Sequence, residues 1–178
     1  MVSLLDELKH GARILQRQAQ SHDGTALERL RALPELSKLD DAALAAEVQR
    51  RHCLAVVARE LGFAGWPQAS AVLGGETVED FGTLLWRPAL SVFSNIWSAH
   101  YDEARRLREE TGGYLLVYRK HFFIVDRYYV EALGLDPDDA DWERLGRDWA
   151  RPADPEARER LYARLIRAQV PQVLAPAA

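Results

Sequence analysis

Two histidines are the side chains of this sequence best suited to acid–base chemistry. His100 lies in the run SVFSNIWSAHYDEARRL, residues 91–107, and His121 lies in the run YLLVYRKHFFIV, residues 114–125. An imidazole titrates near neutral pH, so it can act as a general acid, a general base or a metal ligand. We therefore take His100 and His121 as the candidate catalytic residues.

A structural role for His100 is the favoured interpretation. A helix over 88–110 would place His100 between Phe93, Ile96 and Ala104 on an apolar face, so we expect it to point inward. A buried histidine needs only hydrogen-bond partners for its two ring nitrogens. A metal site would require His100, His121 and Glu103 to converge, which their spacing does not demand. We therefore expect no metal and no cofactor.

The densest group of aromatic and polar residues surrounds 114–129. Such a group can stack a planar ligand and bind its anionic part through Arg119. The alternative, which we favour, is a small sheet covered by half-buried tyrosines. The candidate ligand-binding residues are Trp97, Tyr114, Tyr118, Arg119 and Tyr128.

Composition and motifs exclude several classes of function. Lys and Arg number 23 against 27 Asp and Glu, and the net charge of −4 disfavours nucleic-acid binding. No apolar run is long enough to cross a bilayer, so we expect no membrane partner. No phosphate-binding loop, nucleophile elbow or paired-cysteine motif is present. The acidic run DPDDADWE, residues 136–143, lacks the spacing of a calcium loop and is interpreted as a capped, solvated turn.

The first 75 residues predict a helical unit. Apolar spacing and capping residues favour helices over 3–20, 24–33 and 39–62, and a short one between Gly65 and Gly74. The run VVARELGFAGWPQASAVL, residues 56–73, resembles a helical segment found in bacterial proteins ahead of ankyrin repeats or other domains. The resemblance covers about residues 3–75. It implies an all-helical unit of bacterial origin and carries over no catalytic residue.

The rest of the chain predicts a mixed unit. A linker over 74–88 leads to the long central helix, and residues 114–125 favour a hairpin or strand pair. Arg119 and Lys120 fall at its turn, where neither suits a positive φ, so a loop wider than two residues is expected. Asp126 and Asp154 are predicted to cap two of the C-terminal helices.

The sequence thus predicts a mainly α protein with a small β element. The expected division is a helical unit at 1–75 and an α+β unit at 76–178, with a shared core left open. The single cysteine, Cys53, favours a reducing cytoplasm. The first functional hypothesis is a non-enzymatic interaction or ligand-binding protein of the bacterial cytoplasm. An unpaired β element would allow two copies to form a homodimer. The second is a small enzyme with a histidine, tyrosine and arginine pocket between the central helix and the strands.

Overall fold

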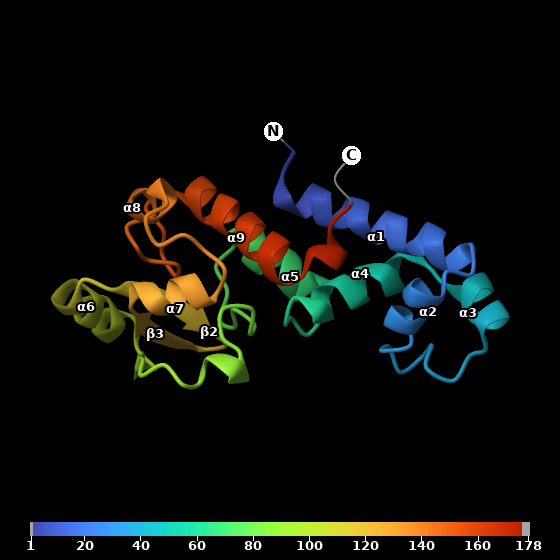
Figure 1. Cartoon of the computed structure of the whole chain (residues 1–178), viewed down its shortest axis with the longest axis horizontal. Coiled ribbons are helices and arrows are strands. Elements are labelled where there is room, and N and C mark those ends of the chain that lie inside the picture. The colour runs from blue at the N-terminus through green and yellow to red at the C-terminus, as the bar shows by residue number, and fades with distance from the viewer. Residues whose placement is uncertain (1, 176–178) are drawn as a thin grey trace.

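The computed structural model describes residues 2–175. Within that range nine α-helices accompany one small antiparallel sheet, which confirms the expected mainly α class. The molecule is elongated, with the N-terminal helices at one end, the sheet at the other and helix α9 (Pro155–Gln169) running between them (Figure 1). No helix in residues 2–175 combines the length and the apolar character needed to cross a membrane.

The N-terminal helices follow the predicted apolar spacing, and side-chain caps fix their starts. Ser3, Asp23 and Asp40 each accept a hydrogen bond from a backbone amide in the first turn of a helix. Leu8, Ala12 and Leu15 form the buried face of the first helix, as predicted. The five helices are α1 (Leu4–Gln20), α2 (Gly24–Leu30), α3 (Asp41–Glu47), α4 (Arg50–Glu60) and α5 (Trp66–Leu73).

The single helix predicted over 39–62 is wrong, because the chain breaks between α3 and α4. Val48 leaves the helical conformation with ψ at 128° and is buried, and Gln49 is extended. The amide of Gln49 donates to Nδ1 of His52 at 3.1 Å, so His52 caps the new helix start. The burial of Val48 and the hydrogen bond between Gln49 and His52 outweigh the helical preference of the alanine-rich residues before them.

The long central helix predicted over 88–110 is also wrong. Pro88–Leu90 forms a 3₁₀ turn, Ile96–Ser98 forms strand β1, and the helix α6 spans only Tyr101–Thr111. Trp97 stacks on Phe123 of strand β3 (His121–Val125) with ring centres 4.5 Å apart. Cross-strand pairing of these apolar residues therefore overrides their helical spacing.

The sheet has the strand order β1-β3-β2, with β2 (Tyr114–Tyr118) and β3 (His121–Val125) forming the predicted hairpin. Its loop has only two residues, Arg119 and Lys120, so the expected wider loop is wrong. Arg119 has φ at +51°. Its amide donates to the carbonyl of Gly82 at 2.7 Å and its carbonyl accepts from the amide of Phe81 at 2.9 Å. Pairing with the linker thus holds the tight turn.

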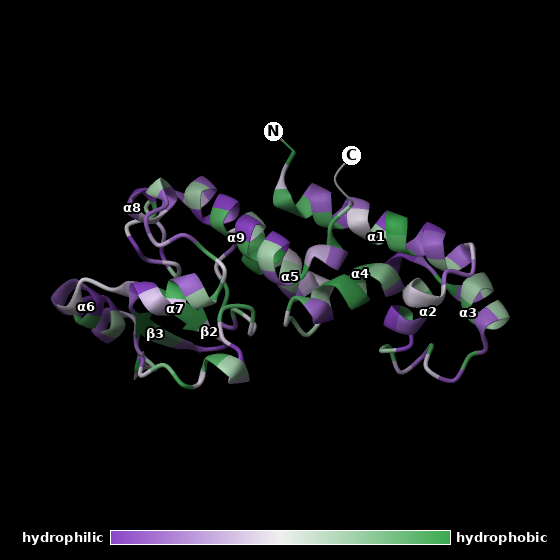
Figure 2. Cartoon of the chain, viewed as in Figure 1, coloured by the Kyte–Doolittle hydropathy of each residue, from purple (hydrophilic) through white to green (hydrophobic). Residues whose placement is uncertain are grey.

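The C-terminal half closes around the sheet and returns to α1. Asp126 and Asp154 cap helices as predicted. One buried apolar core includes Leu8 and Val57 as well as Leu116, Trp149 and Leu161, so it runs across residue 75. Figure 2 shows hydrophobic residues, in green, on the strands of the sheet and along much of α4. The helices are α7 (Arg127–Ala132), α8 (Ala140–Arg144) and α9 (Pro155–Gln169), followed by a 3₁₀ turn at Pro171–Val173.

We predict that Gly82→Ala destabilises the fold by about 2 kcal/mol, measured by urea unfolding. Gly82 has φ at +72°, and an added Cβ would lie 2.5 Å from the Phe63 ring. Gly24→Ala is the matched control, because no atom lies within 4 Å of its added Cβ. The control should leave the protein as stable or stabilise it by up to about 1 kcal/mol. If both changes altered the free energy of unfolding equally, the conformation and close packing of Gly82 would not be important for stability.

Candidate functional site

A cavity of about 370 Å³ lies where the linker after α5, the start of α6, strand β3 and the start of α9 meet. This volume falls within the range of small-molecule sites. Figure 1 shows the linker running from the end of α5 down toward the sheet. The lining residues are Val72, Gly75, Glu76, Thr77, Val78, Phe81, Tyr101, Phe122, Ala150, Arg151, Pro152, Pro155 and Arg158.

Arg158 is the buried cation of this cavity. Its residue surface is only 7% exposed, and its Nη1 donates to the carbonyl of Trp149 at 3.0 Å. Among residues 2–175 no carboxylate lies within ion-pair distance of it. Its Nη2 faces Gly75, where the missing side chain leaves room for the guanidinium, since a Cβ there would lie 3.3 Å away. A buried charge without a counter-ion favours the binding of an anion.

Arg151 provides a second cation at the cavity wall. Its guanidinium carbon lies 3.9 Å from the centre of the Tyr101 ring, which is a close cation–π contact. The Tyr101 hydroxyl donates to Oδ2 of Asp148, a buried carboxylate. Oδ1 of Asp148 accepts from the amides of Ala150 and Arg151 at 3.0 and 2.9 Å. The loop that carries Arg151 is therefore fixed by Asp148.

The Tyr101 hydroxyl stays protonated at neutral pH. Burial, and then its hydrogen bond to Asp148, raise the pKa of Tyr101 to about 12. A phenol with so high a pKa is a poor general base. Its role in the cavity is to present a flat ring and to hold Arg151 above it.

Aromatic and apolar side chains form the remaining walls. Phe81 meets Phe122 edge to face with ring centres 6.4 Å apart, and Phe122 meets Tyr101 in the same way at 5.8 Å. Val72, Val78 and the two prolines complete the apolar lining. The cavity thus combines two guanidinium groups and the carboxylate of Glu76 with aromatic and apolar surfaces.

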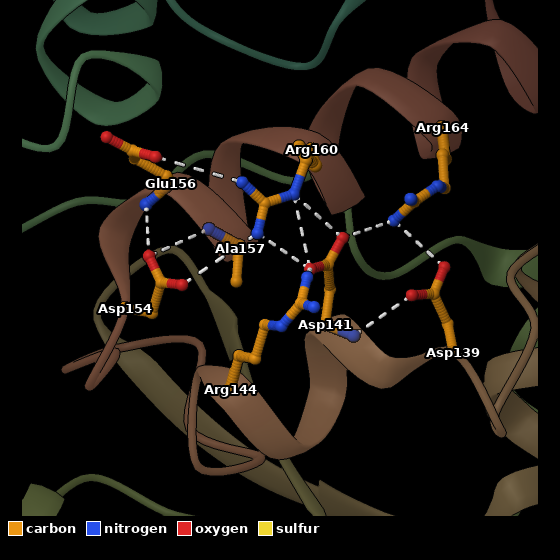
Figure 3. A network of polar contacts seen from close by, with 8 residues as sticks. All are labelled: Asp139, Asp141, Arg144, Asp154, Glu156, Ala157, Arg160 and Arg164. Carbon is orange, nitrogen blue, oxygen red and sulfur yellow. Dashed lines mark hydrogen bonds and ion pairs between the residues drawn. The ribbon is translucent and has the colours of Figure 1, made fainter.

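A network around Asp141 fixes the helix that carries Arg158 (Figure 3). The Asp141 side chain is 2% exposed and accepts from Arg160 at 2.7 Å, Arg164 at 2.7 Å and Arg144 at 3.0 Å. Arg160 and Arg164 belong to α9 and Asp141 to α8. The hydrogen bond from Arg160 first, and then those from Arg164 and Arg144, hold the pKa of Asp141 well below its usual range.

This network corrects the expectation of a solvated turn at 136–143. Asp139 does cap α8, since its Oδ1 accepts from the amide of Asp141 at 3.0 Å. Asp141 itself is buried and joins α8 to α9 instead of facing water. The arginines that pair with Asp141 also meet other carboxylates, those of Asp139, Asp154 and Glu156, so the site is an ion-pair network. Among residues 2–175, no three His, Cys, Asp or Glu residues lie close enough together to hold a metal ion.

His100 does not point into the core, and the expected inward orientation is wrong. It is exposed and lies at the N-cap of α6, where its amide donates to the Ser98 hydroxyl at 3.0 Å. His121 is also exposed, at the first position of β3. Neither histidine lines the cavity. The structure therefore places both candidate catalytic residues outside it.

The five candidate ligand-binding residues fall in three places. Trp97 and Tyr118 meet edge to face at 6.0 Å, and Arg119 lies 5.6 Å from the Tyr118 ring centre. Tyr114 is buried instead, and its hydroxyl donates to the Pro137 carbonyl at 3.0 Å. Tyr128 is 63% exposed on α7. None of the five lines the cavity.

The sequence interpretation missed Arg158, Arg151 and Tyr101. A signal for Arg158 was present, because it precedes the buried Leu161 and Tyr162 by three and four residues and so lies on the apolar face of α9. A charged residue within an apolar stripe is a pointer to a buried polar site. Nothing comparable marks Arg151, which lies in an irregular segment.

Comparison with known proteins gave no match to any family model, to any curated protein or to any solved structure. The geometry of the cavity is therefore the basis on which a function can be assigned to this chain.

We predict that Asp141→Asn destabilises the protein by about 3 kcal/mol at pH 7, measured by urea unfolding, because three arginines lose their buried partner. The folded-state pKa of Asp141 lies below its unfolded value. The carboxylate therefore stabilises the fold above the unfolded pKa of about 3.9, and this stability is lost as the pH falls below it.

The difference between the wild type and the Asp141→Asn variant should accordingly begin to shrink below about pH 5 and go on shrinking as the pH falls toward the folded-state pKa. Glu156→Gln is the control, since Glu156 meets the same Arg160 but its side chain is 87% exposed. That change should cost no more than about 0.5 kcal/mol. A pH-independent difference for Asp141→Asn would contradict the role of its charge.

Proposed function

We propose that this protein is a non-enzymatic binding protein for a small anionic molecule, which it takes up in the cavity beside Arg158. The observation that carries the proposal is a cation 7% exposed, bonded only to a backbone carbonyl among residues 2–175 and lining a space of about 370 Å³. Guanidinium groups recognise carboxylates and phosphates through paired, charge-assisted hydrogen bonds. An anion in the cavity would supply the missing counter-charge.

Binding is favoured over catalysis by the protonation states around the cavity. Its phenol keeps its proton at neutral pH, its arginines cannot give theirs up, and its one carboxylate, Glu76, is exposed to solvent. The alternative of a small enzyme requires His100 and His121 to converge with Arg119 on one pocket. Both histidines are exposed and lie outside the cavity, so no observation favours that alternative.

We predict that phosphate, citrate or benzoate raises the midpoint of thermal unfolding of the wild-type protein, and that the rise is lost in Arg158→Met. A ligand at about one hundred times its dissociation constant stabilises the folded state by about 2.7 kcal/mol. Arg106→Met is the matched control, because Arg106 is exposed on α6 and does not line the cavity. The control should respond as the wild type does. A rise that persists in Arg158→Met would contradict the proposed site.

We also propose that two copies pair through the outer edge of β1. In the described chain this edge has no strand partner, and Ile96 and Trp97 are 40% and 43% exposed. Residues 88–99 contain no charged side chain, whereas edge strands are commonly protected by charges. A bacterial, cytoplasmic setting is part of the same proposal. The cytoplasmic part is supported by the single cysteine, Cys53, which is buried and unpaired, and the bacterial part by the resemblance of residues 56–73.

We predict that Ile96→Lys converts the dimer to a monomer, because the new charge would face the same strand of a second copy. Sedimentation velocity at several protein concentrations measures the change. Val2→Lys is the control, since Val2 is 67% exposed and belongs to the N-terminal end of the chain, away from the sheet (Figure 1). A wild-type protein that stays monomeric at high concentration would rule out the dimer.

A further inference from the structure

The chemistry of the cavity wall separates a carboxylate ligand from a phosphate ligand, and the choice between them rests on the function proposed above. Phosphate sites commonly offer several free backbone amides or an open helix N-terminus in addition to basic side chains. Carboxylate sites can rely on a single guanidinium fork. The amides next to the cavity therefore decide between the two.

The helix start beside the cavity is already occupied by a carboxylate. Pro155, the first residue of α9, lines the cavity and has no amide hydrogen. The next two amides, of Glu156 and Ala157, donate to Oδ1 of Asp154 at 2.9 and 3.2 Å. The N-terminus of α9 thus carries its own negative charge and has no place for a phosphate.

Four other amides of the lining are also used within the protein. Those of Gly75 and Glu76 donate to the carbonyls of Val72 and Ala71 at 3.2 and 2.9 Å. Those of Ala150 and Arg151 both donate to Asp148. The wall directly beside Arg158 therefore offers guanidinium groups, and the amides of Thr77 and Val78, for which residues 2–175 provide no partner, lie on the extended linker and not at a helix start.

The charges of the wall favour a ligand with a single negative charge. Two cations, Arg151 and Arg158, face the cavity together with one anion, Glu76. The positive charges of the wall therefore exceed its negative charges by one, and one carboxylate would balance this excess. An organic phosphate near neutral pH carries up to two negative charges and would be repelled by Glu76 and by Asp154.

The shape and polarity of the remaining wall favour a flat, apolar ligand body. The rings of Phe81, Phe122 and Tyr101 form a continuous series of edge-to-face contacts, and the Arg151 guanidinium covers the Tyr101 ring. Such surfaces stack aromatic rings. A volume of about 370 Å³ accommodates one or two rings.

From these observations we infer that the ligand of the cavity is a small aromatic monocarboxylate. Its carboxylate pairs with the guanidinium of Arg158, and its ring lies against the aromatic wall formed by Phe81, Phe122 and Tyr101. Arg151 covers the outer end of the ring or meets the carboxylate from the solvent side.

Four probes of closely related shape test the inference: benzoate, benzamide, phenyl phosphate and acetate. We would titrate each into ¹⁵N-labelled protein and follow the amide and arginine Nε signals by NMR, which measures millimolar affinities. Benzoate should shift the Nε signal of Arg158 and bind at least about tenfold more tightly than benzamide and phenyl phosphate. Acetate, which has no ring, should bind more weakly than benzoate.

Variants connect the binding to the assigned residues. Arg158→Lys keeps the charge but loses the paired donors, so it should weaken benzoate binding by about tenfold. Arg151→Met, at an exposed position that tolerates substitution, should weaken it less. Arg106→Met should leave it unchanged. Benzoate binding that is equal in Arg158→Lys and the wild type would overturn the inference.

The outcomes also separate this inference from the proposed function. If phenyl phosphate binds more tightly than benzoate and still depends on Arg158, the anion site stands and the assignment of a monocarboxylate is wrong. If benzamide binds as well as benzoate, the charge of the ligand is not recognised and the assignment is equally wrong. If none of the four probes, nor inorganic phosphate, binds at the cavity, both the inference and the proposed function fail.

Discussion

The buried carboxylate of Asp141 is the interaction on which the rest of the structure depends. It accepts hydrogen bonds from three arginines, and the two that belong to α9, Arg160 and Arg164, hold that helix against α8. A buried anion costs free energy unless its hydrogen-bonding capacity is filled, so the arginines and Asp141 fix one another. The position of α9 is set in this way. On the same helix, the buried face that includes Leu161 and Ile166 completes the apolar core.

Because α9 is held in place, the charged side chain of Arg158 stays buried at the cavity. Arg158 lies one turn after the start of that helix and is held by the Trp149 carbonyl alone. A flexible chain would turn such a side chain out to water, where its hydration is recovered. The rigid helix leaves it buried instead, so a ligand of the proposed kind would meet a guanidinium that is already ordered and would avoid the entropy cost of ordering a long side chain.

The linker after α5 serves the cavity and the sheet at once. Phe81 contributes to the aromatic wall through its ring, while its backbone amide pairs with Arg119 in the hairpin turn. Gly82 completes that pairing and lies close to Phe63 of the N-terminal half. The N-terminal half and the sheet are therefore joined through this one short segment. A ligand in the cavity would contact residues contributed by both halves of the chain.

The mainly α class, most helix starts and the hairpin could be predicted from the residues alone. These features are local: Ser3, Asp23, Asp126 and Asp154 cap helices through amides two or three residues away. Long-range packing determines the other elements. Residues 96–98 have helical spacing but form a strand, because Trp97 gains more by stacking on Phe123 than by continuing a helix.

The candidate site shows the same division between what local sequence determines and what long-range packing determines. His100 and the aromatic residues near 114–128 were notable for their residue types alone, yet the structure disperses them. The cavity instead joins Phe81, Tyr101, Arg151 and Arg158, which belong to four separate segments of the chain. Local spacing carries no information about such long-range contacts. Only the packing of α9 against the linker and the sheet brings these side chains together.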